Sequence, residues 1–427
     1  MSKLSKINPN GRLSLKQNFS WILVGNIVFA FSQWFIISIM TKIGTSEMVG
    51  MYTLALGVTA PIFLFLNLNL RSIQATDQLG YYSFVSFFLF RNFTSVIAVI
   101  ITLISLLILQ YSIELSIIIF LIAINKFIES QSDVIFGYFQ RIENMNLIAK
   151  SKIIKAIITM IIFGLLLYIS NNLLLSIIGI LISNLVILIT YDLSNLHKKG
   201  VNRIFGKEIY KILKERKLLV SLFLLGLPLG AASALDSLTI NSQRYVIENV
   251  LSLEQLGYYA SITYLMVAGQ TIVGALSHAA LPRLSHLYIN DFNKYIKLIL
   301  KLFLIGIIIA SFLIFISYNF GALILEIIYT KEYSEYSNLF ILIMVCASIW
   351  YLTGFLNAAL LATRRFNHQF LIYGASFLST FILTILLIPS LGLFGAAIGL
   401  LLGMLTRLIF IVLILIKEYV SKNKSIA

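Results

Sequence analysis

Charged residues are scarce in this sequence, and acidic ones are the scarcest. Asp, Glu, Lys and Arg make up only 11% of the 427 residues, with 17 acidic against 32 basic side chains. Soluble domains carry about 25% charged residues, so this composition excludes a large water-exposed domain and favours a chain embedded in lipid. The chain has one cysteine, Cys346, which excludes a disulfide within the chain.

The sequence also lacks the short motifs of nucleotide binding and metal catalysis. It contains no Walker loop, no nucleotide fingerprint, no nucleophile elbow and no spacing of metal ligands. We therefore expect no catalytic residues, no metal site and no cofactor. ATP-driven transport by this chain alone is disfavoured for the same reason.

Long runs of apolar residues make up most of the sequence. Hydrophobic residues make up 59% of the chain, and its mean hydropathy is +0.95. A helix of about 20 apolar residues crosses the ~30 Å hydrocarbon core of a membrane. The sequence therefore predicts an all-α polytopic membrane protein with twelve transmembrane helices. The predicted spans are residues 19–41, 49–70, 82–109, 115–138, 150–169, 173–191, 218–242, 257–280, 295–318, 337–361, 367–388 and 393–416.

Basic residues are distributed unevenly between alternate loops. With a cytoplasmic N-terminus, the predicted outer loops contain only Lys42, Arg244 and Lys331. Apart from the cations inside spans, all other Lys and Arg residues fall on the cytoplasmic side, as the positive-inside rule describes. We therefore expect both termini in the cytoplasm. This topology and anionic lipid headgroups explain the net charge of +15, so we expect no nucleic acid partner.

The chain divides near its middle into two similar halves. The longest polar stretch, residues 195–217, is basic and falls between the sixth and seventh spans. Short segments echo one another across it: Glu47–Tyr52 with Glu254–Tyr259, and Arg71 with Arg283. We predict two six-helix lobes, residues 1–194 and 218–427, joined by this cytoplasmic linker and related by a pseudo-twofold axis. In transporters with such repeats, cargo binds where the repeats meet.

Six ionisable residues lie inside the apolar runs, where a charge costs roughly 2.5–3.5 kcal/mol. They are Arg91, Lys126, Glu129, Asp133, Asp236 and Arg407. Residues of this kind usually face a bundle interior or a water-filled cavity. Because three of the six are cationic, they indicate a polar passage that favours an anionic cargo.

Structural roles are alternatives for some of these positions. Lys126, Glu129 and Asp133 share one helix face by their spacing, so mutual neutralisation in an ion-pair cluster competes with a binding role. For Arg407, snorkelling to the membrane surface is the alternative. Glycines recur at intervals of four in the last span and favour close helix packing. They are Gly395, Gly399 and Gly403.

Several stretches, taken in order, resemble one known family. In the first half they are Gly25-Asn-Ile with Ser32-Gln-Trp34, Pro61 to Arg71 with Ala75-Thr-Asp77, and Asn125 to Asp133 with Gly137 and Gln140-Arg141. In the second half they are Leu227-Pro-Leu-Gly230, Arg244-Tyr245, Val267-Ala-Gly269, Leu281-Pro-Arg283 and Ala362-Thr-Arg364-Arg365-Phe366. Together they resemble the polysaccharide-biosynthesis flippases of the O-antigen and capsule type. These belong to the multidrug, oligosaccharidyl-lipid and polysaccharide (MOP) exporter superfamily.

The resemblance implies a MATE-like fold and a non-enzymatic flippase of the bacterial inner membrane. Its cargo would be an undecaprenyl-pyrophosphate-linked oligosaccharide, translocated by alternating access, with membrane lipids, a glycan polymerase and a chain-length regulator as further partners. Cations suited to the diphosphate are Arg91, Lys126 and Arg407 at depth, with Arg71, Arg283 and Arg244 at helix ends. Arg71 and Arg283 also fit plain cytoplasmic anchors. Candidates for a coupling proton or sodium ion are Glu129, Asp133 and Asp236.

Other functions fit the sequence less well. A drug exporter of the same superfamily typically has a carboxylate in its first span, and residues 19–41 contain no Asp or Glu. The peptidoglycan lipid flippase is another exporter of a lipid-linked precursor, but it has a longer chain and more spans. A membrane glycan polymerase or ligase would need a long outer loop with Arg or His, and the predicted outer loops are short.

Overall fold

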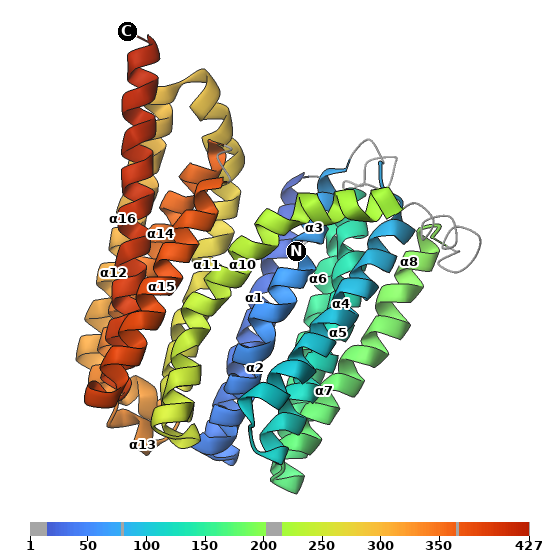
Figure 1. The fold of residues 1–427 in the computed structure, drawn as a ribbon, viewed down its shortest axis with the longest axis vertical. Coiled ribbons are helices and arrows are strands. Elements are labelled where there is room, and N and C mark those ends of the chain that lie inside the picture. Colours follow the sequence, from blue (N-terminus) through green and yellow to red (C-terminus); the bar gives the residue numbers. More distant parts are fainter. Residues whose placement is uncertain (1–14, 78–80, 202–215, 364–366, 427) are drawn as a thin grey trace, which may run out of the picture. The chain divides into compact units, whose positions relative to one another are not determined.

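The computed structural model describes residues 15–77, 81–201, 216–363 and 367–426, and the elements assigned there are helices (Figure 1). The all-α prediction is therefore confirmed for the part of the chain that is described. The first half contains α1 (Leu15–Ile43), α2 (Ser46–Asn67), α3 (Leu70–Thr76), α4 (Phe84–Leu109), α5 (Ile113–Arg141), α6 (Met145–Ser170), α7 (Leu173–Ile187), η1 (Leu188–Leu193) and α8 (Ser194–Lys198). The second half contains α10 (Arg216–Val250), α11 (Leu253–Asn290), α12 (Phe292–Ile328), α13 (Lys331–Ser334), α14 (Ser337–Ala362), α15 (Asn367–Leu391) and α16 (Leu393–Ile426).

Within the described residues, eleven helical segments are long and apolar enough to cross a membrane. The protein is thus a multi-pass membrane protein. The eleven do not include α5, a helix of 29 residues that carries several charged side chains. The predicted twelfth span, which is α5, stays a prediction.

Polar side chains fix several helix starts. Ser83, Ser112 and Asn172 each accept a hydrogen bond from the backbone N–H three residues further on. The first N–H groups of a helix have no partner inside the helix, so a side-chain oxygen at this position satisfies one of them. These caps set where α4, α5 and α7 begin.

The helices form two compact units, and the chain passes between them more than once. Unit 1 comprises residues 1–36 and 58–234, and unit 2 comprises residues 37–57 and 235–427. The end of α1 and the start of α2 therefore belong to unit 2. The predicted division of the chain at residues 195–217 stays a prediction, and most of that linker lies outside the described residues.

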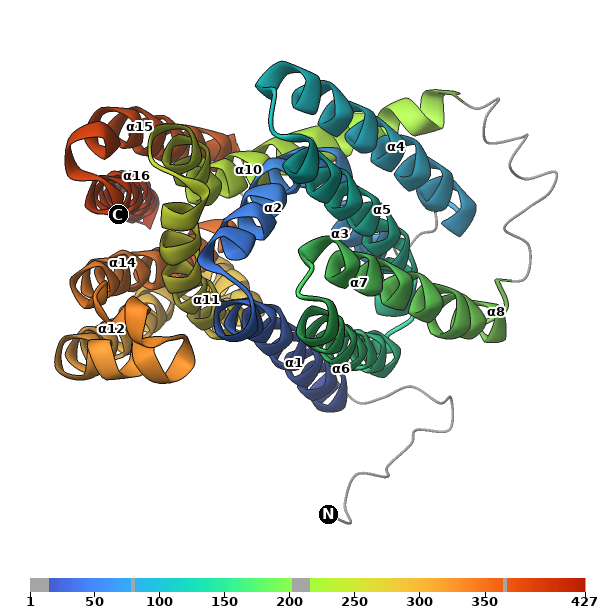
Figure 2. The same ribbon diagram turned by 90° about the horizontal axis from the view of Figure 1, so that it is seen from below.

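In unit 1, α5 packs between α4 and α7, and α6 packs against α7 (Figure 2). The short helix α3 lies against α5. The buried apolar core beside them includes Phe87 and Phe139, which are completely or almost completely shielded. This packing holds the polar face of α5 in a defined place, and that face forms the site described below.

In unit 2, α15 packs along α16, and α14 packs against α11, α12 and α16. The glycines of α16 lie against α15. At Gly395 an added Cβ atom would lie 2.3 Å from the Leu387 carbonyl oxygen. At Gly399 it would lie 2.6 Å from Thr384 Oγ1, and at Gly403 it would lie 1.6 Å from Thr380 Oγ1. Only glycine permits so close an approach of two helices. The prediction of close helix packing at these glycines is confirmed.

Candidate functional site: a cationic cavity in unit 1

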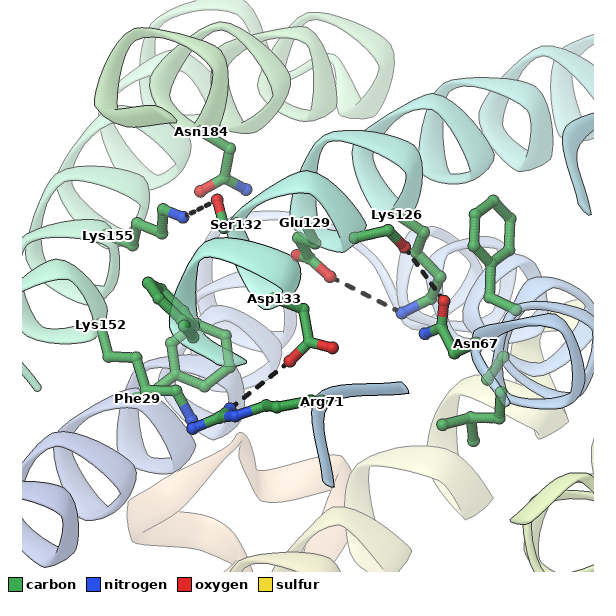
Figure 3. A pocket seen from close by; sticks show the side chains of 15 residues that line it. Phe29, Asn67, Arg71, Lys126, Glu129, Ser132, Asp133, Lys152, Lys155 and Asn184 are labelled. Atoms are coloured by element: carbon green, nitrogen blue, oxygen red, sulfur yellow. Dashed lines mark hydrogen bonds and ion pairs between the residues drawn. The ribbon is translucent and has the colours of Figure 1, made fainter. Parts of the chain in front are cut away.

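A cavity of about 300 Å³ lies within unit 1. Its walls come from α1, α2, α3, α5, α6 and α7, and Figure 3 shows the polar side chains that point into it. The lining residues are Phe29, Ala60, Phe63, Leu64, Asn67, Arg71, Lys126, Glu129, Ser130, Ser132, Asp133, Phe136, Lys152, Lys155 and Asn184. The cavity therefore brings together Arg71, Lys126, Glu129 and Asp133 from the sequence-predicted set.

A left-handed bend places Arg71 at the cavity. Leu68 and Asn69 have φ values of 50° and 48°, a region that side chains other than glycine rarely adopt. Leu68 is fully buried, and two glycines of α10 leave room for it: a Cβ at Gly226 would lie 2.6 Å from Leu68 Cβ. The bend ends α2 and starts α3, so Arg71 at the second position of α3 turns toward α5. Strained backbone of this kind is frequent at functional sites.

Asp133 is held by two arginines. Its carboxylate oxygens lie 3.0 Å from Arg91 Nη2 and 3.5 Å from Arg71 Nη1. Arg91 is completely buried and also donates to the backbone and side-chain oxygens of Asn67. The predicted substrate-binding residue Arg91 therefore lies behind the cavity wall, where it neutralises and orients Asp133, and only Arg71 of the two reaches the cavity.

Lys126 and Glu129 form the next part of the polar face of α5. Lys126 Nζ lies 4.0 Å from Glu129 Oε2, which is a weak ion pair. Glu129 also accepts a hydrogen bond of 3.0 Å from Asn125, whose oxygen in turn accepts one of 2.8 Å from Asn184. The alternative of mutual neutralisation along α5 holds only for Lys126 and Glu129, because Asp133 pairs with arginines from other helices.

Two cations of the cavity were not recognised from the sequence. Lys152 and Lys155 were counted among the cytoplasmic charges, but α6 begins at Met145 and both side chains line the cavity. Lys155 Nζ lies 2.9 Å from Asp192 Oδ2 and 2.5 Å from Ser132 Oγ. The spacing of three between the two lysines puts them on one helix face, a signal that could have separated them from the exposed Lys150.

The buried Asp192 belongs to a π-helical segment. Residues 188–193 form η1, and Asp192 is completely shielded from solvent. A π-helical turn shifts the register of the side chains that follow it and often occurs at functional sites. Here the turn lies where Asp192 meets Lys155, so the ammonium group near the cavity has a fixed counter-charge behind it.

The other predicted residues lie in unit 2. Arg407 is buried and forms an ion pair with Asp236: its Nη2 lies 2.6 Å from Asp236 Oδ1, although the geometry is not that of a hydrogen bond. Its guanidinium lies over the Tyr373 ring, 4.7 Å from the ring centre. Snorkelling of Arg407 is therefore wrong. Arg244 was predicted in an outer loop but lies inside α10, because that helix continues to Val250. Its side chain is buried and donates a hydrogen bond of 2.7 Å to the Thr53 carbonyl oxygen. Arg283 is exposed on α11.

The charges around the cavity do not cancel. Four cations line it, namely Arg71, Lys126, Lys152 and Lys155, against the two carboxylates of Glu129 and Asp133. Behind the wall, Arg91 and Asp192 add one charge of each sign. The cluster thus has an excess of two positive charges in a setting partly lined by phenylalanine, where electrostatic attraction is stronger than in water. Such a site favours an anion.

Among the described residues, no group of three or more His, Cys, Asp or Glu side chains is arranged to hold a metal ion. The cavity donors are ammonium, guanidinium, amide and hydroxyl groups. These groups suit phosphate and sugar oxygens.

Solved structures with a similar fold are membrane transporters. The lipid II flippase MurJ in an inward closed conformation aligns with a TM-score of 0.73 at 15% identity, covering 93% of this chain and 87% of that one. A multidrug resistance MATE family transporter of the MOP superfamily, in an outward-facing conformation, aligns with a TM-score of 0.60 at 13% identity, covering 96% and 97%. The fold is thus that of the MOP-superfamily transporters.

Sequence comparison gives the family. The profile of the polysaccharide biosynthesis protein family matches residues 15–288. The capsular polysaccharide biosynthesis protein CapF of Staphylococcus aureus is 31% identical over 400 residues, which cover 92% of this chain and 97% of that protein. The chain belongs to the polysaccharide biosynthesis protein family, as its resemblance implied.

Proposed function

We propose that the protein is a flippase for an undecaprenyl-pyrophosphate-linked oligosaccharide, the repeat unit of an O-antigen or capsule. It moves this lipid from the cytoplasmic to the outer leaflet of the bacterial inner membrane by alternating access. The family, the curated relative involved in capsular polysaccharide biosynthesis and the flippase among the structural neighbours all support this proposal.

The observation that carries the proposal is the charge of the cavity. Its lining has four cations and two carboxylates, an excess of two positive charges. A diphosphate with a substituent at each end has two ionised oxygens, so its charge equals the excess of the site. A matched anion avoids the cost of an uncompensated charge in a low-dielectric setting.

The uncharged lining suits the other parts of this cargo. Asn67, Asn184, Ser130 and Ser132 offer amide and hydroxyl groups to sugar oxygens. A volume of about 300 Å³ fits the diphosphate and the first sugar, and the isoprenoid tail stays in the surrounding lipid. The remaining sugars extend into water.

The other predicted residues have separate roles in this proposal. Exposed Arg283 on α11 recruits the headgroup from the cytoplasmic side, and the buried Arg407 and Arg244 act on the cargo later in the cycle. Glu129 is the best of the coupling-ion candidates, because its nearest cation is 4.0 Å away whereas Asp133 has two arginines. Asp236 beside Arg407 is a second candidate. A glycan polymerase and a chain-length regulator would receive the product.

Translocation in proteoliposomes tests the proposal. Purified protein is reconstituted with a lipid-linked oligosaccharide bearing a terminal sugar that an added glycosidase removes only from the outer leaflet. We expect the protein to increase the rate of sugar release, and Lys126→Gln to lower it about tenfold, as for the loss of one charged hydrogen bond. Release that is no faster than in empty liposomes would refute the proposal.

The same assay addresses the drug-exporter alternative. Multidrug transporters share the fold, but a cationic drug would be repelled by an excess of positive charge. We therefore expect no uptake of a cationic dye under a proton or sodium gradient. Dye transport without oligosaccharide transport would assign the protein to that function instead.

A further inference from the structure

One cation of the cavity differs from all the others in its partner. Arg71, Lys126 and Lys155 each lie within 4.0 Å of a carboxylate oxygen. Among the residues that the structure describes, Lys152 has no such ion pair: its Nζ donates to the amide oxygen of Asn26 at 2.7 Å and lies 5.7 Å from the centre of the Phe29 ring. Its hydrogen bond and its ring contact are therefore both to neutral groups.

The side chain of Arg71 approaches this unpaired ammonium group. Figure 3 shows the ends of Lys152 and Arg71 directed toward one another. Arg71 repels the Lys152 ammonium group, and the carboxylates of Asp133 and Glu129 attract it from beyond ion-pair distance. The ion pair of Arg71 with Asp133 is the weaker of two: the Arg71 guanidinium lies 3.5 Å from the carboxylate, whereas that of Arg91 lies 3.0 Å from it. Two like charges that face each other in a partly apolar cavity repel, and a bound anion between them would relieve that repulsion.

We infer that Lys152 and Arg71 form the clamp that binds the diphosphate, with Lys152 as its principal charge. This inference rests on the proposed function and assigns a binding residue that the sequence did not indicate. The ammonium group offers three rotatable donors as a point charge, and the guanidinium offers a planar fork that binds phosphate oxygens bidentately. The two groups come from α6 and α3, so one diphosphate bridges two helices.

Asn26 on α1 is the positioning residue for this clamp. Its amide oxygen orients the Lys152 ammonium without neutralising it. An aspartate of nearly the same shape would convert this neutral hydrogen bond into an ion pair, and Lys152 would then have a carboxylate like the other cavity cations. The neutral partner is thus what leaves the lysine charge available to a ligand.

Binding measurements on the full-length protein in nanodiscs test the assignment. The probe is farnesyl diphosphate carrying N-acetylglucosamine, a short-chain disubstituted diphosphate, titrated by calorimetry. We expect Lys152→Gln to weaken binding about tenfold or more, as for the loss of one charged hydrogen bond. Lys152→Arg should keep most of the affinity. Lys150→Gln is the matched control, because Lys150 is exposed on the same helix, and it should bind like the wild type.

Asn26→Asp separates a ligand-binding role from a structural one. If Lys152 only joins α6 to α1, the stronger ion pair in Asn26→Asp leaves binding unchanged and raises the melting temperature. If Lys152 belongs to the clamp, Asn26→Asp weakens binding to about the same degree as Lys152→Gln while the protein remains as stable as the wild type or more so.

Failure of the inference is distinct from failure of the proposed function. Wild-type protein that binds the probe, with Lys152→Gln and Asn26→Asp binding equally well, would overturn the clamp and leave the flippase proposal standing. Wild-type protein that does not bind the probe would overturn both. Equal loss in Lys150→Gln would show a general effect of net charge and would also reject the clamp.

Discussion

At the scale of single residues, access to the cavity distinguishes Arg91 from the four cations that line it. Arg91 is completely shielded and satisfies Asn67 and Asp133. Among the described cations of unit 1 it is the most completely buried, and it does not line the cavity. We interpret its role as support: it neutralises Asp133, whose side chain is 32% exposed at the cavity, and lowers the cost of holding that carboxylate inside the protein.

Replacement of Arg91 should therefore act mainly on stability. Removing one partner of a fully buried ion pair costs roughly 3–5 kcal/mol. The Asp133 side chain is 32% exposed and keeps its contact with Arg71, so we expect Arg91→Met to cost less, about 1–3 kcal/mol. We expect a clear fall in the melting temperature of the purified protein. The double variant Arg91→Met with Asp133→Asn should recover part of that loss, because the unpaired charge is gone.

The exposed Arg283 provides the control for this experiment. Arg283→Met removes the same charge from an exposed side chain, and its melting temperature should stay that of the wild type. If Arg91→Met melted like the wild type, or if Asp133→Asn gave the double variant no benefit, the supporting role of Arg91 would be wrong.

At the scale of helices, the two echoing glycine segments pack against one another within unit 2. A Cβ atom at Gly50 of α2 would lie 2.0 Å from the Leu253 carbonyl oxygen, and one at Gly257 of α11 would lie 1.8 Å from the Ser46 carbonyl oxygen. Each glycine thus faces the backbone at the start of the other helix. The similarity of these segments in the sequence reflects a reciprocal crossing of α2 and α11 at their first turns.

Alanine at Gly257 should weaken this crossing. The added methyl group would meet backbone and not a flexible side chain, so the helices must separate, and overpacking of this kind typically costs about 1–3 kcal/mol. We expect a lower melting temperature for Gly257→Ala. Gly274→Ala in the same helix is the control: its Cβ would meet nothing within 4 Å, and removing a helical glycine stabilises by roughly 0.5–1 kcal/mol. Equal melting temperatures for the two variants would contradict the crossing.

The helices were predictable from the sequence, whereas the partners of the polar side chains were only partly so. Apolar runs located α4 and α7 to within a few residues because a membrane imposes helix length. Spacing put Lys126, Glu129 and Asp133 on one face. Spacing could not show that Asp133 pairs with Arg91 of another helix. That contact depends on how the two helices are rotated about their axes relative to one another, which the residue spacing within one helix does not determine.

Lys152 and Lys155 were missed for a different physical reason. Near the end of a span, a lysine that anchors the helix to lipid headgroups has the same sequence signature as one that lines a cavity. The left-handed bend at Leu68 was equally hidden, because leucine gives no local signal for that conformation and the glycines that accommodate it lie on α10.

At the scale of the whole molecule, the proposed charge match has a consequence for energetics. The cavity has an excess of two positive charges, from four lining cations and two carboxylates. In the proposed cycle, and with no coupling ion bound, a disubstituted diphosphate would neutralise that excess, and the loaded protein would move no net charge during translocation. The empty protein would retain the excess, and its return toward the cytoplasm would be the step that carries charge.

An inside-negative membrane potential should therefore accelerate repeated turnover. Moving one charge through the full membrane at 100 mV changes the free energy by about 2.3 kcal/mol, and the excess charge crosses some fraction of that field on return. With the potential set by valinomycin and potassium at equal pH on both sides, we expect faster oligosaccharide release at inside-negative potential than at zero. Lys126→Gln, which halves the excess, should weaken the dependence on voltage even where its absolute rate is low.

A single turnover of preloaded protein should respond little, because the loaded cavity is neutral. Multiple turnover that is insensitive to potential, or slowed by it, would show that the cavity charge does not move with the empty protein.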